Sequence, residues 1–285
     1  MIRSARFRAS LVLTAAGLFA TLSVPSLEAA ALRWEKDFKS ARTRARNEGK
    51  IVMVDFWAAW CKYCEKLDQT TYKDAAVVAR LSRTTVPVKV NAEGRSDEVE
   101  LGDEHGVESL PTIGFFTSEG RAVARIEGYV DPAAFLKLLN TAEIEGADMT
   151  EWEKVLRLDP GNFEALYGLG AKMYELDYHD DARPLLERAR KIDTGSLRQR
   201  KRVRMMLARI IESQSSFTDS ETMLREGLAL PPEPDSDPRL QLLLSRCLAT
   251  LGKTKEAKSV LVDLIAAYPK HAVTATAKKT LEGIK

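Results

Sequence analysis

Two cysteines separated by two residues, Cys61 and Cys64, follow closely on an apolar run of this 285-residue chain. Residues 51–57 are mostly β-branched or aromatic and predict a buried strand over 51–56. Cysteines three positions apart lie on one face of a helical turn, where their sulfurs can form a small reversible disulfide ring. A helix that begins at a cysteine places unpaired backbone N–H groups and the positive end of the helix dipole beside the thiolate. The pattern therefore predicts thiol–disulfide exchange.

Three other uses of such a pair fit the sequence less well. A structural zinc site needs about four ligands, and Cys247 and the three histidines all lie far away in sequence. A c-type haem requires histidine directly after the second cysteine, where this chain has Glu65. A static disulfide across so short a ring removes little chain entropy and stabilises weakly. We expect a redox-active pair that uses neither metal nor cofactor.

The N-terminus has the pattern of a secretory signal peptide. Three arginines lie within residues 1–10, residues 11–22 are apolar and uncharged, and residues 29–31 are alanines. The apolar run is shorter than the ~20 residues that a membrane span needs, which argues against the alternative of an anchor. We predict a signal peptide over residues 1–31, cleaved near Ala29 to Ala31. The mature chain should be periplasmic, in an oxidising compartment, with no stable membrane span.

Composition and length limit the partners and the number of domains. The formal net charge is only +2, with 29% charged residues, which argues against nucleic acid as the main partner. The length without the signal peptide allows two domains. We expect these at residues 32–147 and 148–285. The first should be α/β. Its expected helices are at 34–47, 62–67, 74–81, 96–105 and 131–139, and its expected strands are at 51–56, 85–90 and 122–126.

Residues 34–141 resemble the thioredoxin superfamily, and within it the C-terminal periplasmic domain of DsbD-type thiol:disulfide interchange proteins. The residues that carry the resemblance are Val54, Asp55, Phe56, Trp57, Trp60, Cys61, Lys62, Tyr63, Cys64, Thr71, Tyr72, Asp74, Val77, Val90, Asn91, Leu110, Pro111, Thr112, Phe115, Phe116, Gly128, Tyr129 and Phe135. The resemblance implies an α/β thioredoxin fold, a central mixed sheet flanked by helices.

The same resemblance implies a role for each site residue. Cys61 would be the exposed, low-pKa nucleophile, and Cys64 the resolving thiol. Pro111 would be the cis-proline that orients the substrate backbone, the alternative being an ordinary strand-edge proline. Asp55 would be a buried acid that shuttles the proton of Cys64, the alternative being a salt-bridged aspartate at a strand end. The expected partners are client proteins with disulfides and a redox donor protein.

The remaining expected substrate contacts are Trp60, Lys62, Tyr63 and Leu110. Thioredoxins proper have Gly-Pro between the cysteines, and this chain has Lys62-Tyr63. A nearby lysine favours thiolates, although an exposed lysine acts weakly through solvent. The sequence leaves the direction of electron flow open. The resemblance favours a reductase, and the alternatives are an oxidase or isomerase and a non-enzymatic adaptor with a redox-gated docking domain.

Beyond residue 147 the sequence predicts helices only. Thr150 with Glu153 forms a capping box that predicts a short helix ending at Leu158. The segment 157–162 recurs as 191–196, an offset of 34 residues, which resembles the tetratricopeptide (TPR) period. We expect an all-α TPR-like helical solenoid of three hairpins and a capping helix, the alternative being a generic helical bundle. Such a stack usually presents a surface to a peptide or protein partner.

Two further features of this region lead to separate expectations. A basic run predicts a solvated helix face, the alternative being a patch for an acidic peptide or a membrane surface. Its residues are Arg198, Arg200, Lys201, Arg202 and Arg204. Cys247 lies on an apolar helix face and is expected to be a buried free thiol, the alternative being a third redox centre.

Overall fold

A four-stranded mixed sheet of strand order β2-β1-β3-β4 organises the first part of the chain. Strand β1 (Ile51–Trp57) pairs in parallel with β2 (Thr85–Asn91) and antiparallel with β3 (Thr112–Phe116). Strand β4 (Ala122–Glu127) pairs antiparallel with β3. The structure, a computed structural model, describes residues 31–284, so the predicted signal peptide lies outside the described residues except for its last alanine.

Helices cover both faces of this sheet, which explains why β1 is apolar along most of its length. The helices are α1 (Phe38–Glu48), α2 (Lys62–Gln69), α3 (Ala75–Thr84), α4 (Ser96–Glu104) and α5 (Pro132–Leu158), with a short 3₁₀ helix, η1 (Thr71–Lys73). Met53 of β1 packs in a core with residues of α2, α3 and α5, whereas Val52 and Val54 pack in a second core with residues of α1. The mixed sheet between helices confirms the predicted fold.

The opening helix begins four residues later than the sequence predicted. Asp37 caps α1 by accepting a hydrogen bond from the backbone N–H of Ser40 at 2.6 Å. Before the cap, the chain is extended, and Glu35 forms a parallel bridge with Val88. Trp34 therefore lies outside the helix, and its ring packs edge-on against Tyr72 at 5.3 Å.

Helix α5 corrects the prediction of two helices, one ending near Leu139 and another beginning at Thr150. It is a single helix of 27 residues, in which Thr150 Oγ1 donates to the carbonyl of Gly146 at 2.7 Å instead of capping a new helix. Burial of Met149 in the core that includes the sheet favours continuation over a break. The domain boundary that we expect, between residues 147 and 148, lies within this helix.

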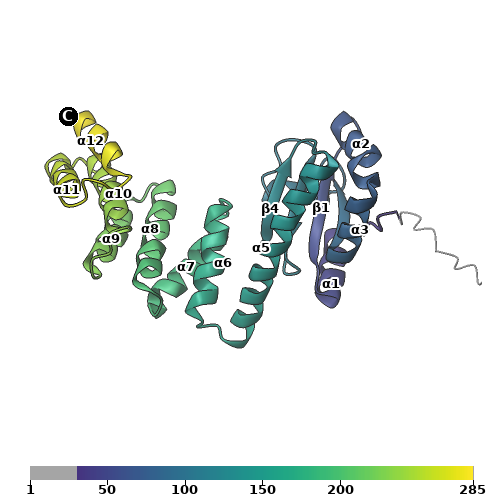
Figure 1. The fold of residues 1–285 in the computed structure, drawn as a ribbon, viewed down its shortest axis with the longest axis horizontal. Helices are drawn as coiled ribbons and strands as arrows, with labels where there is room; N and C mark the ends of the chain where they lie inside the picture. The colour runs from purple at the N-terminus through teal and green to yellow at the C-terminus, as the bar shows by residue number, and fades with distance from the viewer. Residues whose placement is uncertain (1–30, 285) are drawn as a thin grey trace, which may run out of the picture.

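Three helical hairpins follow α5 and end in a capping helix (Figure 1). They are α6 (Phe163–Glu175) with α7 (His179–Ile192), α8 (Leu197–Ser213) with α9 (Phe217–Ala229), and α10 (Asp237–Thr250) with α11 (Thr254–Ala267), followed by α12 (Thr274–Gly283). The first helices begin at 163, 197 and 237, so the spacing is 34 residues and then 40. The longer second spacing contains the proline-rich segment 231–234, and the hairpins form the predicted TPR-like solenoid.

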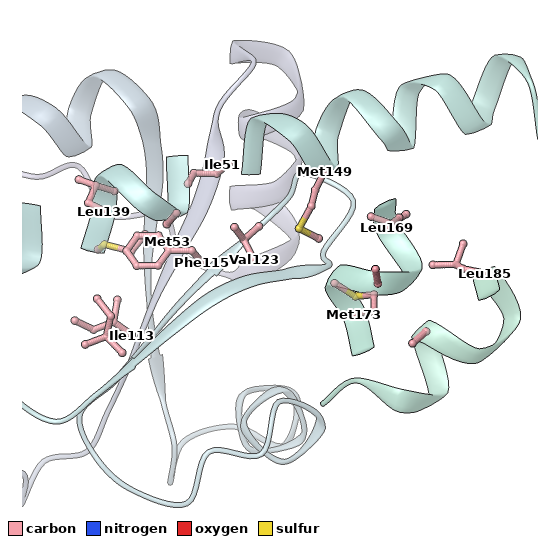
Figure 2. Packing of buried hydrophobic residues seen from close by; sticks show 14 of the residues in the cluster. Ile51, Met53, Ile113, Phe115, Val123, Leu139, Met149, Leu169, Met173 and Leu185 are labelled. Atoms are coloured by element: carbon pink, nitrogen blue, oxygen red, sulfur yellow. The ribbon is translucent and has the colours of Figure 1, made fainter. Parts of the chain in front are cut away.

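The two parts of the chain share one hydrophobic core. Figure 2 shows Met149 of α5 between residues of the sheet, such as Val123, and residues of the first hairpin, such as Leu169 and Met173. Polar contacts also cross between the parts, since His105 Nδ1 and the Tyr178 hydroxyl lie 3.2 Å apart. In residues 31–284 no helix is long and apolar enough to cross a membrane.

Candidate redox site

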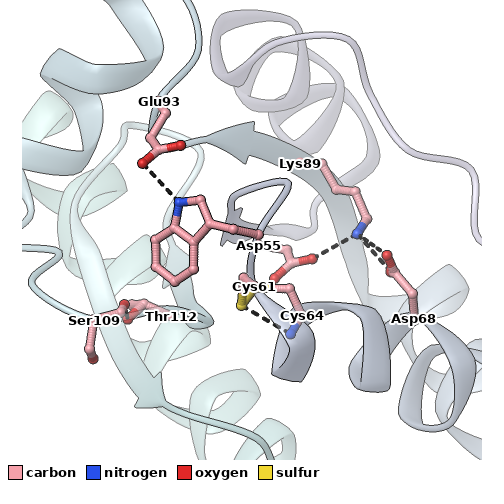
Figure 3. The surroundings of a disulfide bond; sticks show 9 residues. Asp55, Cys61, Cys64, Asp68, Lys89, Glu93, Ser109 and Thr112 are labelled. Carbon is pink, nitrogen blue, oxygen red and sulfur yellow. Dashed lines mark hydrogen bonds and ion pairs between the residues drawn. A yellow bond between two sulfur atoms is a disulfide. The ribbon is translucent and has the colours of Figure 1, made fainter.

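Cys61 and Cys64 form a disulfide at the beginning of α2 (Figure 3). Cys61 is the N-cap residue of this helix, and its Sγ accepts a hydrogen bond from the backbone N–H of Cys64 at 3.1 Å. A sulfur in this position lies beside the free N–H groups of the first turn, from which it can accept hydrogen bonds, and beside the positive end of the helix dipole. When the pair is reduced, these interactions stabilise negative charge on Cys61 in particular.

The prediction that Cys61 is exposed was wrong. Its exposed fraction is 6%, close to the 3% of Cys64, whereas Trp60 and Tyr63 are 64% and 61% exposed. The side chain of Cys61 turns toward its own helix, where it accepts the N–H of Cys64, and so is withdrawn from solvent. The two flanking aromatic residues therefore form much of the accessible surface beside the disulfide.

Contacts on both sides hold these aromatic side chains. The indole N–H of Trp60 donates to Glu93 at 2.8 Å (Figure 3), and the ring of Tyr63 lies 6.5 Å from that of Tyr129. The ammonium of Lys66 lies 3.9 Å from the centre of the Tyr129 ring. Exposed aromatic surface next to a reactive disulfide suits contact with another protein.

The chain enters β3 through a cis peptide bond between Leu110 and Pro111, as the resemblance implies. Thr112, the next residue, pairs with Phe56 near the end of β1 from which the cysteine helix starts. The antiparallel pairing therefore brings Pro111 to the same end of the sheet as the disulfide. The carbonyl of Pro111 accepts from the N–H of Gly128 at 2.8 Å.

Asp55 is fully buried in the middle of the sheet, beside Lys89, which was not among the predicted site residues. The parallel register places Lys89 of β2 opposite Asp55, and Lys89 Nζ lies 3.0 Å from its carboxylate. Lys89 also donates to Asp68 of α2 at 2.6 Å. Burial raises the pKa of Asp55 to about 6, an effect that the charge of Lys89 opposes and that of Asp68 adds to.

Three aromatic rings surround the ammonium of Lys89. Its Nζ lies 5.0 Å from the ring centre of Trp34, 5.7 Å from that of Trp57 and 5.8 Å from that of Tyr72. The negative ring faces favour a cation at this position. One signal in the sequence was informative. Lys89 lies between two members of a series of alternating valines, at 86, 88 and 90, so its side chain points to the face of the strand opposite to theirs.

The basic run at the start of α8 does not form a single solvated face. Lys201 is fully buried and pairs with Asp237, while Arg204 is buried and donates to Asp193 at 2.8 Å. Arg198 and Arg202, four positions apart, face a different side. Cys247 is a buried free thiol whose Sγ donates to a backbone carbonyl. Within the described part of the chain, no cluster of histidine, cysteine and acidic side chains is arranged to hold a metal ion.

Comparisons with known proteins match the first part of this chain. Residues 38–143 match the family model described as "Thioredoxin-like domain". A thiol:disulfide interchange protein DsbD of Vibrio vulnificus is 34% identical over 95 residues, which is 33% of this chain and 16% of the relative. The aligned part thus spans about a sixth of that relative. Residues 38–143 therefore form a thioredoxin-like domain, and this domain carries the Cys61–Cys64 pair.

Two solved structures are also similar to this chain. A thioredoxin from Thermus thermophilus is 28% identical, covers 41% of this chain and 90% of its own, and has a TM-score of 0.38. YrrB, described as a TPR protein with an unusual peptide-binding site, is 21% identical, covers 53% and 74% of the two chains, and has a TM-score of 0.39. The first aligns with less than half of the chain and the second with about half.

Proposed function

We propose that this protein is a periplasmic thiol:disulfide oxidoreductase that reduces client disulfides through Cys61 and Cys64, while the TPR-like domain recruits a protein partner. The observation that carries this proposal is the disulfide at the N-cap of α2, within a domain that matches the thioredoxin-like family model. Similarity to DsbD supports the reductase direction. The N-terminal sequence pattern supports export, with the mature domains at residues 32–147 and 148–285.

The proposed reaction has two exchange steps. The Cys61 thiolate attacks one sulfur of the client disulfide, forms a mixed disulfide and releases the other client sulfur as a thiolate. The Cys64 thiolate then attacks Cys61 Sγ, which forms the intramolecular disulfide and releases the second client thiolate. The client gains two electrons, and a dithiol donor protein must reduce the pair again for the next cycle.

Asp55 has the properties of the base for the second step. It lies on the strand that leads into the cysteine helix, and its pKa of about 6 leaves it ionised but basic near neutral pH. A base with a pKa near the working pH accepts a thiol proton more effectively than an ordinary aspartate. We therefore assign Asp55 the removal of the Cys64 proton, and Trp60, Lys62, Tyr63, Leu110 and Pro111 the contact with substrate.

Insulin-disulfide reduction with dithiothreitol as electron donor tests the enzymatic part of the proposal. The wild type should accelerate precipitation of the reduced insulin chains, and Cys61→Ser should abolish the acceleration. Cys247→Ser is the matched control and should retain full activity, because Cys247 is buried in the helical domain. A wild type without turnover would favour the adaptor alternative. A redox potential near that of strong oxidants such as DsbA would favour the oxidase.

A further inference from the structure

The first helices of the hairpins line a hollow of about 780 Å³ that is rich in arginine. Its five arginines are Arg198, Arg202 and Arg209 of α8 and Arg239 and Arg246 of α10. Among the described residues that line it, Asp235 is the only acidic one. We call this hollow the arginine groove.

Three of these arginines have no acidic partner among the residues that the structure describes. Arg198 pairs with Asp235, and Arg202 donates to Glu175 at 2.7 Å outside the groove. Within residues 31–284, no carboxylate lies in ion-pair range of the other three, Arg209, Arg239 and Arg246, all of which are exposed. Unneutralised like charges that converge on one hollow create a positive potential that attracts anions.

Apolar side chains also line the groove on both helices. In the sequence, Met205 and Met206 lie between Arg202 and Arg209 of α8, and Leu242 and Leu243 lie between Arg239 and Arg246 of α10. An inorganic anion leaves this apolar surface uncovered. Single-stranded nucleic acid binds proteins largely by stacking on aromatic rings, and the described lining contains one ring, that of Tyr174.

We propose that the arginine groove binds an acidic peptide segment of the partner protein, in which one or two large apolar side chains lie between carboxylates. This inference rests on the proposed recruiting role of the helical domain and specifies the chemistry of the partner. Guanidinium groups bind carboxylates through paired hydrogen bonds, and methionine adapts to apolar side chains of different shape.

The position of the groove separates recruitment from exchange. In Figure 1, α8 and α10 lie away from α2, with α5 and the first hairpin between them. A client held in the groove must therefore carry its acidic segment apart from the disulfide that reaches Cys61.

Fluorescence anisotropy with the full chain tests this inference. The probe is a fluorescein-labelled peptide with a Leu-Phe centre flanked on both sides by Glu and Asp. The wild type should bind it saturably and more weakly as sodium chloride is raised. Arg209→Glu with Arg246→Glu should weaken binding by roughly tenfold or more, because two attractive charges become repulsive. Arg239→Gln alone should weaken it less.

The matched control is Lys191→Glu with Lys255→Glu. It changes the net charge equally, at exposed positions on α7 and α11 that do not line the groove. This control variant should bind the probe like the wild type. A second control is a peptide with Ser in place of both Leu and Phe, which the wild type should bind more weakly than the probe. Circular dichroism verifies that each variant is folded.

Several results would overturn the inference: no saturable binding by the wild type, equal loss in the control variant, or tighter binding of oligo(dT) or phosphatidylglycerol vesicles through the same arginines. Insulin reduction, measured on the same samples, keeps this outcome distinct from that of the proposed enzyme function. Intact turnover without peptide binding rejects only the recruitment chemistry. Absent turnover rejects the enzyme even where the peptide binds.

Discussion

The ammonium of Lys89 lies 3.0 Å from the carboxylate of Asp55, at paired positions on adjacent parallel strands. Asp55 has no access to solvent and occupies the strand that precedes the cysteine helix. The lysine partly offsets the cost of burying this carboxylate but does not cancel it, since the pKa of Asp55 remains raised to about 6. A buried carboxyl group with a raised pKa thus lies on the strand before the disulfide, and perturbed pKa values of this kind cluster at functional sites.

Asp55→Asn should stabilise the protein at neutral pH. A folded-state pKa of about 6 against an ordinary 3.8 means that the folded protein binds this proton more tightly than the unfolded chain. The contribution of Asp55 to stability is therefore fully present below about pH 4 and is lost as pH rises through 6, at a cost of up to about 3 kcal/mol.

Urea unfolding at pH 7 and pH 4 measures this effect. The variant should exceed the wild type in unfolding free energy at pH 7 and match it at pH 4, while insulin reduction becomes slower. Equal stability of the two proteins at both pH values would show that folding does not raise the pKa of Asp55.

Lys89→Met should have the opposite effect, because it removes the cation that opposes protonation of Asp55. We expect a loss of roughly 2 kcal/mol or more at pH 7, and a shift of the activity profile toward higher pH as the pKa of Asp55 rises. The same substitution in the Asp55→Asn background should cost much less. A double-mutant cycle measures the difference, and identical costs in both backgrounds would mean that the two residues are not coupled.

The continuous helix α5 makes a prediction about stability alone. Met149 is buried between the sheet and the first hairpin, so Met149→Ala should cost about 2–5 kcal/mol. Ile144 lies on the same helix but is 58% exposed, and Ile144→Ala is the control, expected to change stability by less than about 1 kcal/mol. Similar losses for both variants, measured by urea unfolding, would contradict the packing of α5 in the shared core.

Most of the first domain was predictable because its signals are local. Apolar runs located β1 and β2, and the helices expected from residues 74 and 131 begin there, with Asp74 and Asp131 as the N-cap residues of α3 and α5. The length of α5 was not predictable, since burial of Met149 depends on a sheet distant in sequence. The capping box predicted at Thr150 is a local signal for a new helix, and the tertiary contact of Met149 outweighs it.

The site shows the same division between local and long-range information. The cysteines follow from the motif and Asp55 from the family resemblance, whereas Lys89 and Asp68 required the strand register and the placement of α2. In the helical domain, the basic run looked uniform in sequence. The helical turn of about 100° per residue divides it, so that Lys201 is buried while Arg198 reaches the arginine groove.

Trapping with Cys64→Ser tests the central claim most directly. Without the resolving thiol, Cys61 should retain clients as mixed disulfides in cells, which mass spectrometry identifies after non-reducing purification. Cys61→Ser, which retains Cys64, is the matched control and should trap far less, because its remaining thiol is not the N-cap residue of α2. Adducts that form through Cys61 and disappear on reduction are the predicted result. Absence of adducts with Cys64→Ser, or equal trapping by both variants, would contradict the exchange mechanism.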